Sequence, residues 1–247
     1  MKILIKIAYD GKNYCGWQVQ KNGDSVQGRI CEAAEQVYGE RVAVTGCSRT
    51  DSGVHAKEYY CTLDTSENAP RVPLDRLPTA LNCHLPEDIT VFGAWEMEAS
   101  FHARYSVAEK TYEYLFDNGL VRDPFLFGRA WHIPKRLDEK VMDEAARHFV
   151  GEHDFSAFMA SGSTVESTVR RITEAKVVRE GEKVIFRVTG NGFLYNMVRI
   201  MVGTLYYVSI GKIAACEIPD IIKNAQRTGA GITAPPSGLY LTSVKYQ

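Results

Sequence analysis

The chain has 247 residues, of which 45% are hydrophobic and 24% charged, and its formal net charge is −1. This composition excludes an intrinsically disordered protein, and the length suits one large domain or two smaller units that share a core. A near-zero net charge does not favour a nucleic-acid-binding protein, although a basic stripe on one face is compatible with a neutral total.

Cysteine and histidine spacing predicts no metal site. The six cysteines include no Cys-x-x-Cys pair, and the six histidines form no metal-ligand pattern with them. The two common glycine-rich phosphate-binding loops are also missing, which argues against a nucleotide cofactor. We therefore expect neither a metal nor a cofactor.

The start of the chain and its longest apolar stretch indicate whether the protein would be secreted or inserted into a membrane. Residues 1–6 already follow a strand pattern, which predicts no signal peptide. No run of 18 apolar residues occurs, since Asn196 and Arg199 interrupt the longest candidate at 193–210. The sequence predicts a cytoplasmic enzyme or binding protein that does not enter a membrane.

The chain opens with a strand and a helix. Alternating apolar residues predict a strand over 3–9, and Ser25 is placed to cap a helix over 26–37. Between them, Tyr14 and Trp17 lie in a segment rich in glycine, aromatic and amide side chains. These two rings fit either stacking platforms or core residues, and the sequence leaves both interpretations open.

Two short strands follow, over 42–44 and 54–63, with a loop at 47–53 between them. Next come a predicted helix over 73–81 and a predicted strand over 89–97.

The second half again mixes strands and helices. The pattern predicts a strand at 111–116, a helical stripe from 137 to 149, a hairpin of 169–178 and 183–189, a long helix from 194 to 205 and a final strand from 239 to 246. The turn after residue 116 and the segment up to Pro124 form the best candidate boundary between halves. This mixed order predicts an α+β fold, with mainly antiparallel sheet and helices packed on it, in two halves of similar size.

One carboxylate in the loop at 47–53 is a candidate catalytic group. Asp51 lies in a strand-to-strand connection beside Arg49 and small residues, and loops on a rigid scaffold often carry function. A carboxylate there can act as a nucleophile or as a general base. The structural alternative is an ordinary turn, in which the Asp51 side chain caps its own backbone.

Arg199 is a second candidate, because it lies at the shoulder of an otherwise apolar helix. If it is buried, its guanidinium needs a partner, since an unpaired buried charge is costly. An arginine close to Asp51 would favour the ionised carboxylate and orient it. The alternative is that Arg199 extends along the surface to reach water.

Seven sequence blocks occur in order along almost the whole chain. They are AYDGKNYCGWQVQ at 8–20, SRTDSGVHA at 48–56, ALNCHLPEDI at 80–89, FHARYS at 101–106, GEHDF at 151–155, NGFLYNMVR at 191–199 and PSGLYL at 236–241. Together they resemble the motifs of the tRNA pseudouridine synthase A (TruA) family. In the second block Ser48 and Ser52 stand where the family usually has Gly and Ala; both are small, so we expect the loop path to be kept.

The resemblance implies a role for five residues. Asp51 matches the catalytic aspartate, and Tyr112 matches the tyrosine that stacks on the target uracil. Arg199 matches the basic residue that pairs with the aspartate, and Arg49 matches the arginine that helps to hold the RNA with the nucleotide flipped out. Leu239 matches an apolar residue that walls the pocket.

The resemblance also implies a pseudouridine synthase fold. In that fold two α/β halves share a mainly antiparallel central sheet, with helices packed on it and an active-site cleft between the halves. We expect residues 1–100 to carry the aspartate loop and residues 101–247 to carry the tyrosine strand and the arginine helix. The two halves would together form one catalytic unit.

The implied activity is that of an isomerase that converts uridine to pseudouridine at nucleotides 38, 39 and 40 of the tRNA anticodon stem-loop. The implied assembly is a homodimer. With a near-neutral net charge, a basic patch assembled across a dimer is more plausible than one broad basic groove.

Two alternatives from other classes stay open. An RNA-binding protein or RNA chaperone without chemistry would have no need of Asp51. A hydrolase that cleaves a glycosidic bond usually requires two carboxylates, and near Asp51 in sequence only Glu58 and Asp64 are available.

Overall fold

The structure is a computed structural model that describes residues 1–21, 23–162 and 165–247. It divides into two compact units, Met1–Ala108 with Leu241–Gln247, and Glu109–Tyr240. The division expected from the sequence, after residue 100, differs from these units in two places: residues 101–108 and the last seven residues lie with the first unit. Each unit is described by itself.

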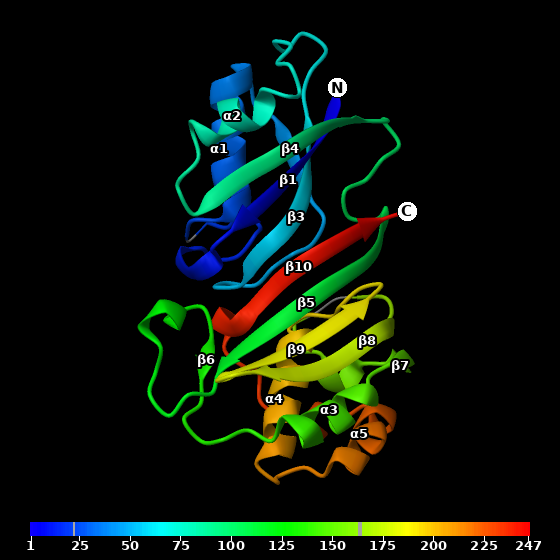
Figure 1. Ribbon diagram of the computed structural model, residues 1–247. Coiled ribbons are helices and arrows are strands. Elements are labelled where there is room, and N and C mark those ends of the chain that lie inside the picture. The colour runs from blue at the N-terminus through cyan, green and yellow to red at the C-terminus, as the bar shows by residue number, and fades with distance from the viewer. Residues whose placement is uncertain (22, 163–164) are drawn as a thin grey trace. The chain divides into compact units, whose positions relative to one another are not determined.

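The first unit contains an antiparallel sheet with helices packed on it (Figure 1). Its strands lie in the order β4-β1-β3-β10, and β2 pairs antiparallel with the last four residues of β3, residues 61–64. The elements are β1 (Lys2–Tyr9), the short 3-10 helix η1 (Gly11–Asn13), α1 (Val26–Tyr38), β2 (Ala43–Gly46), β3 (His55–Asp64), α2 (Leu77–Asn82), β4 (Ile89–Met97) and β10 (Leu239–Tyr246).

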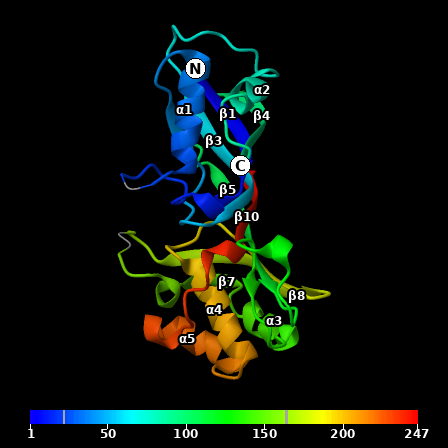
Figure 2. The same ribbon diagram turned by 90° about the vertical axis from the view of Figure 1, so that its left-hand side faces the viewer.

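The core of the first unit follows from the alternation in β1. Ile3, Ile5 and Ile7 are completely buried, because successive side chains of a strand point to opposite faces and the odd positions face the helices. Figure 2 shows α1 lying along this face. The helix begins where the sequence predicts, since the Oγ of Ser25 accepts a hydrogen bond from the Gly28 N–H at 3.1 Å.

The second unit contains another antiparallel sheet, in the order β5-β9-β8-β7, with β6 parallel to the end of β5. Its elements are β5 (Val107–Asp117), β6 (Trp131–His132), α3 (Glu139–Arg147), β7 (Gly151–Asp154), β8 (Val169–Glu180), β9 (Lys183–Gly190), α4 (Met197–Ser209) and α5 (Ile218–Asn224). The three helices lie on the same side of the sheet (Figures 1 and 2).

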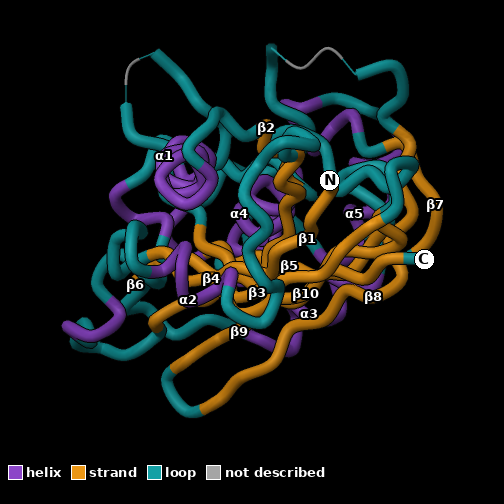
Figure 3. The backbone as a smooth tube through the Cα atoms, turned by 90° about the horizontal axis from the view of Figure 1, so that it is seen from above, coloured by secondary structure: helices purple, strands orange, loops and turns teal. Residues whose placement is uncertain are grey.

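The core of the second unit forms between this sheet and α4. Tyr114, Phe116 and Phe186 are completely buried on the strands, and Met201 and Val202 are completely buried on α4. The predicted hairpin of β8 and β9 is confirmed, and Figure 3 shows its two long strands joined by a short turn. The hairpin therefore contributes two strands to the sheet on which the helices pack.

The expected α+β class is confirmed, with mostly antiparallel sheet and packed helices. The predicted helix at 73–81 begins later, at Leu77, because Pro78 has no N–H and is tolerated only in the first turn of a helix. Tyr14 and Trp17 are core residues, at 6% and 3% exposure. Among the residues that the structure describes, no helix has both the length and the apolar character needed to span a membrane.

Candidate functional site

The aspartate loop, residues 47–54, connects β2 to β3 and carries both Arg49 and Asp51. The antiparallel pairing of the two strands ends at Gly46 opposite Cys61, and the Cys47 N–H donates to the Tyr60 carbonyl at 2.9 Å. The loop then closes on itself, because the Val54 N–H donates to the Asp51 carbonyl at 3.1 Å. The strand-loop-strand arrangement predicted for this stretch is confirmed.

A supporting segment, residues 10–17, holds the aspartate loop from one side. The Trp17 N–H donates to the Thr50 carbonyl at 3.1 Å, and the Gly53 N–H donates to the Tyr14 carbonyl at 3.2 Å. The Ser52 hydroxyl donates to the same Tyr14 carbonyl at 3.3 Å. The backbone is thus fixed immediately before and immediately after Asp51.

Two glycines allow this close approach. Gly16 has a φ of +98°, and a Cβ there would lie 2.5 Å from the Thr50 carbonyl oxygen. A Cβ on Gly11 would lie 1.9 Å from the Val54 carbonyl oxygen. A side chain at either position would displace the loop, which gives a physical reason for glycine in this segment.

Buried aromatic side chains support the loop from the core. The Tyr9 hydroxyl lies 2.8 Å from the Thr50 Oγ1, and the Tyr59 hydroxyl donates to the Ser48 carbonyl. Trp17 stacks on Tyr59 with ring centroids 4.3 Å apart, and burial raises the pKa of the Tyr59 phenol well above its ordinary value. Tyr59 therefore stays a neutral donor to the loop.

His55 adds a polar anchor that sequence reasoning missed. Its ring is 2% exposed, and its Nδ1 lies 2.9 Å from the Asp10 Oδ1 and 3.1 Å from the Gly11 amide nitrogen. The ring therefore ties the first residue of β3 to the start of the supporting segment. The only sequence signal for this role was a histidine four positions after Asp51, with nothing to indicate its partner.

Asp51 itself is half-buried and Arg49 is exposed. A carboxylate at the tip of a rigid loop, partly open to solvent, can reach a bound substrate without first reorganising its backbone. The geometry thus favours the functional interpretation of the loop over an ordinary surface turn.

Tyr112, the predicted stacking residue, lies on β5 in the second unit. It pairs with Val188 of β9 and is 6% exposed. Its ring meets Phe193 edge to face, with centroids 5.1 Å apart and planes at 84°. This contact fixes the plane of the Tyr112 ring.

Arg199 lies in the first turn of α4, where its guanidinium is held by neighbours in the same unit. Its Nε donates to the Ala234 carbonyl at 2.7 Å and its Nη1 to the Asn196 side-chain oxygen at 2.8 Å. Asn196 precedes the helix with a φ of +59°, a backbone conformation that asparagine tolerates better than most residues. These bonds hold the half-buried Arg199 in one direction rather than letting it extend freely to water.

The segment from Ala234 to Leu239 connects Arg199 to the tyrosine strand. The Tyr114 hydroxyl donates to the Pro235 carbonyl at 2.8 Å, next to the carbonyl that Arg199 binds. Leu239 closes this segment and is 5% exposed. Burial raises the pKa of Tyr114, and the nearby positive charge of Arg199 opposes that shift.

The structure therefore places Tyr112, Arg199 and Leu239 in the second unit, where Leu239 is the first residue of β10, and places Asp51 and Arg49 together on the aspartate loop of the first unit. Tyr114 and Asn196 lie beside the candidate site residues of the second unit, and the sequence did not predict them as part of the site. In the described ranges, no group of three or more His, Cys, Asp or Glu side chains is arranged to hold a metal ion.

Comparisons with known proteins identify the family of this chain. A family model described as tRNA pseudouridine synthase matches residues 145–247. The protein named tRNA pseudouridine synthase A from Thermoanaerobacter sp. (strain X514) is 46% identical over 244 residues, covering 99% of both chains. Proteins of the same name from Acetivibrio thermocellus and Ruminiclostridium cellulolyticum are 48% and 47% identical, again over 99% of each chain. The chain therefore belongs to the tRNA pseudouridine synthase A family.

Proposed function

We propose that this protein is a tRNA pseudouridine synthase, an isomerase that converts uridine to pseudouridine in the anticodon stem-loop of tRNA. Family membership over nearly the whole chain carries this proposal. The support of the Asp51 loop on both sides agrees with it, because a catalytic carboxylate needs a fixed position. The target nucleotides are 38, 39 and 40, and the enzyme works as a cytoplasmic homodimer.

The reaction is balanced without an added group. The bond from the ribose C1′ to the uracil N1 breaks, the uracil turns while it stays bound, and C1′ joins the ring carbon C5. The proton on C5 is lost and N1 gains one, so nothing is oxidised or reduced. Asp51 acts in its ionised form, by attacking the sugar, by attacking the ring or by removing a sugar proton.

The other residues hold the substrate. The target uridine must leave its stack, which costs a few kcal/mol and less in a loop. The Tyr112 ring supplies a stacking face worth about 1–3 kcal/mol, and Leu239 adds an apolar wall. Arg49 holds the RNA backbone, and Arg199 keeps the Asp51 carboxylate ionised and oriented.

Incubation with unmodified tRNA tests this function against its rivals. We expect pseudouridine at nucleotides 38, 39 and 40, mapped by chemical labelling and reverse transcription, with no release of base. Free uracil in the supernatant would identify a glycosidic hydrolase instead. Binding of tRNA without any product would identify an RNA-binding protein.

A further inference from the structure

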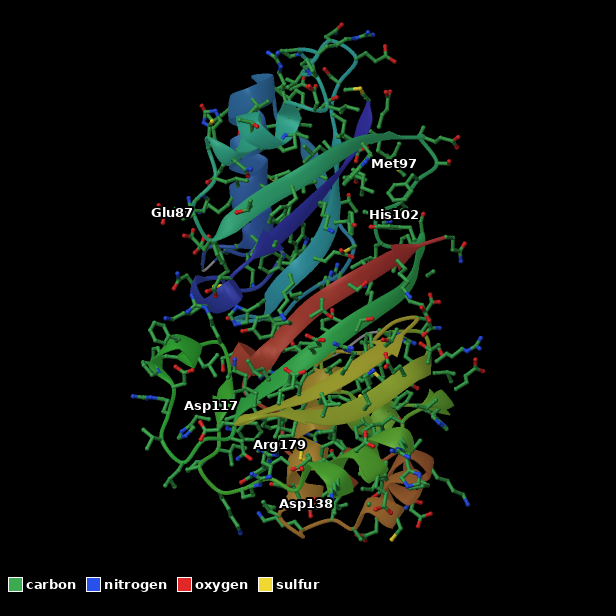
Figure 4. The ribbon with its side chains drawn as sticks, viewed as in Figure 1. Glu87, Met97, His102, Asp117, Asp138 and Arg179 are labelled. Carbon is green, nitrogen blue, oxygen red and sulfur yellow. The ribbon has the colours of Figure 1, made fainter. Side chains whose placement is uncertain are left out.

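A tight turn between β4 and β5, the aromatic turn (residues 102–106), is organised around His102. The His102 Nδ1 accepts hydrogen bonds from two successive backbone N–H groups, those of Arg104 at 3.1 Å and Tyr105 at 3.2 Å. The Ser106 Oγ accepts from the His102 N–H at 3.2 Å, and the Ser106 N–H donates to the His102 carbonyl at 3.0 Å. Four hydrogen bonds within five residues make this turn rigid. Figure 4 labels His102.

The turn is also fastened to the body of the first unit. The buried Ala103 accepts a hydrogen bond at its carbonyl from the Tyr246 hydroxyl, at 2.9 Å. Phe101, just before the turn, packs on the Tyr246 ring with centroids 5.1 Å apart. The Gln247 N–H reaches the Ser106 carbonyl at 3.4 Å. The position of the turn is therefore set by the C-terminal strand.

What this rigid turn presents to solvent is one aromatic ring and one cation. The Tyr105 side chain is 78% exposed, and it leans on the His102 ring with centroids 4.3 Å and planes 35° apart. Arg104 is exposed, and within the part of the chain that the structure describes its guanidinium forms no ion pair. Because Nδ1 is an acceptor, a neutral His102 carries its proton on Nε2, away from the turn.

We propose that the aromatic turn is a contact site for RNA, in which Tyr105 stacks on an unpaired base and Arg104 binds an adjacent phosphate. An aromatic platform beside a cation is the usual way to hold single-stranded nucleic acid, and the His102 ring fixes the plane of the platform before RNA arrives. This inference rests on the proposed function, which supplies an RNA substrate.

RNA fits this surface better than a second protein chain does. The segment leading into the turn contains Glu98 and Ser100, both exposed, so polar side chains precede the Tyr105 ring in the chain. Interface cores between protein subunits are apolar and depleted in charge. A lone ring with a neighbouring guanidinium instead matches the alternation of base and phosphate in a nucleic acid.

Binding of unmodified tRNA, measured by fluorescence anisotropy at several salt concentrations, tests the site. We expect Tyr105→Ala to weaken binding by about 5- to 150-fold, the loss of one stacked base. Phe92→Ala is the matched control, because Phe92 is another exposed aromatic residue of the same unit, at 62% exposure. This control should bind tRNA as the wild type does.

The charge is tested separately. Arg104→Gln should lower the salt dependence of binding, the slope of log K against log salt, by about one. Arg41→Gln removes one exposed positive charge elsewhere in the first unit and should leave the slope unchanged. Equal slopes for the two variants would mean that Arg104 contributes only to the overall electrostatic potential of the protein and makes no specific phosphate contact.

Three results would overturn the inference. Wild-type affinity in Tyr105→Ala, with pseudouridine still formed, would exclude the contact but leave the proposed function intact. Conversion of a dimer to a monomer in Tyr105→Ala, seen by sedimentation, would assign the surface to a second copy of the chain. A wild-type protein that neither binds nor modifies tRNA would overturn the proposed function as well.

Discussion

The Nδ1 of His55 lies 2.9 Å from the Oδ1 of Asp10, across a sequence separation that spans the whole of α1 and β2. The same nitrogen lies 3.1 Å from the Gly11 amide. A ring that is 2% exposed therefore joins the strand after the aspartate loop to the segment that supports this loop. The position of Asp51 depends on a contact that Asp51 itself does not make.

Replacing His55 should consequently change both stability and turnover. His55→Ala leaves a buried amide and a carboxylate without the ring, and we expect the free energy of unfolding to fall by about 1–3 kcal/mol. We also expect kcat to fall more than KM rises, because the loop is less fixed. His55→Asn places an amide near the Nδ1 position and should restore most of kcat.

The control for His55 is Asn82→Ala. Asn82 exchanges two hydrogen bonds with the Val91 backbone, at 2.8 and 2.9 Å, elsewhere in the first unit. Urea unfolding should show a comparable loss of stability, with an unchanged kcat. If His55→Ala behaves like Asn82→Ala in both measurements, then His55 has a purely structural role.

Gly16→Ala should damage the aspartate loop directly, because the new Cβ would lie 2.5 Å from the Thr50 carbonyl oxygen. Gly39→Ala is a matched control: Gly39 also has a positive φ, of +68°, but a Cβ there meets nothing within 4 Å. The control should lose about 1–2 kcal/mol of stability from backbone strain and keep its kcat. We expect a larger loss of stability and a lower kcat in Gly16→Ala, and equal kcat values would argue against loop displacement.

Asp51→Asn should bind tRNA with unchanged affinity and form no pseudouridine, since the amide cannot act as a carboxylate nucleophile or base. Product mapping after prolonged incubation measures the chemistry, and anisotropy measures binding. The backbone contacts on either side of Asp51 involve no side-chain oxygen of Asp51, so the loop should keep its shape. Measurable turnover would remove Asp51 from the catalytic role.

Arg199→Ala should lower both stability and activity. It removes the donors to the Ala234 carbonyl and the Asn196 side chain, and leaving such acceptors unsatisfied costs about 1–3 kcal/mol. Arg199→Lys keeps the charge but cannot hold both acceptors in the planar geometry of a guanidinium, so we expect an intermediate result. Thermal unfolding and single-turnover kinetics provide the two measurements, and wild-type values in Arg199→Ala would contradict the assignment.

The ion pair between Glu139 and Arg179, 2.8 Å apart, gives the second unit a pH-dependent component of stability (Figure 4 labels Arg179). The hydrogen bond from Arg179 lowers the pKa of the Glu139 carboxyl below its ordinary value of 4.5. A lowered pKa means that the stabilisation is fully present above pH 4.5 and is lost as the pH falls through the folded-state pKa. Glu139→Gln should therefore be less stable than the wild type at neutral pH, by about 1 kcal/mol.

The difference in unfolding free energy between the wild type and Glu139→Gln should shrink to zero in acid. Denaturant unfolding across the acidic range measures it. A difference that stays constant as the pH falls would show that the pair does not titrate in the folded protein.

Local patterns in the sequence predicted most of the fold. The strand β4 has the predicted bounds, Ile89–Met97, because its apolar alternation and flanking turns are local signals. The predicted start of the helix α2 is too early, because apolar spacing alone does not show that Pro78 must lie in the first turn of the helix.

The candidate site could be predicted only in part, and the reason lies in sequence separation. Asp51 and Arg199 are candidates from the sequence because their residue types are unusual in their surroundings, and their roles stay predictions. The partners that hold the loop were not found: Asp10 is far from His55 in sequence, and the buried Tyr14 hydroxyl donates to the side chain of Asp88 on a distant loop. Periodicity carries no information about such pairings.

The position of β10 in the sheet of the first unit has a consequence for the synthesis of the protein. The sheet of the first unit includes β10, whose residues 241–246 follow the entire second unit in sequence. While more than a hundred further residues are translated, the nascent chain therefore lacks the strand that pairs with β3 on its β10 side. The sheet of the first unit can therefore be completed only after the second unit has been synthesised.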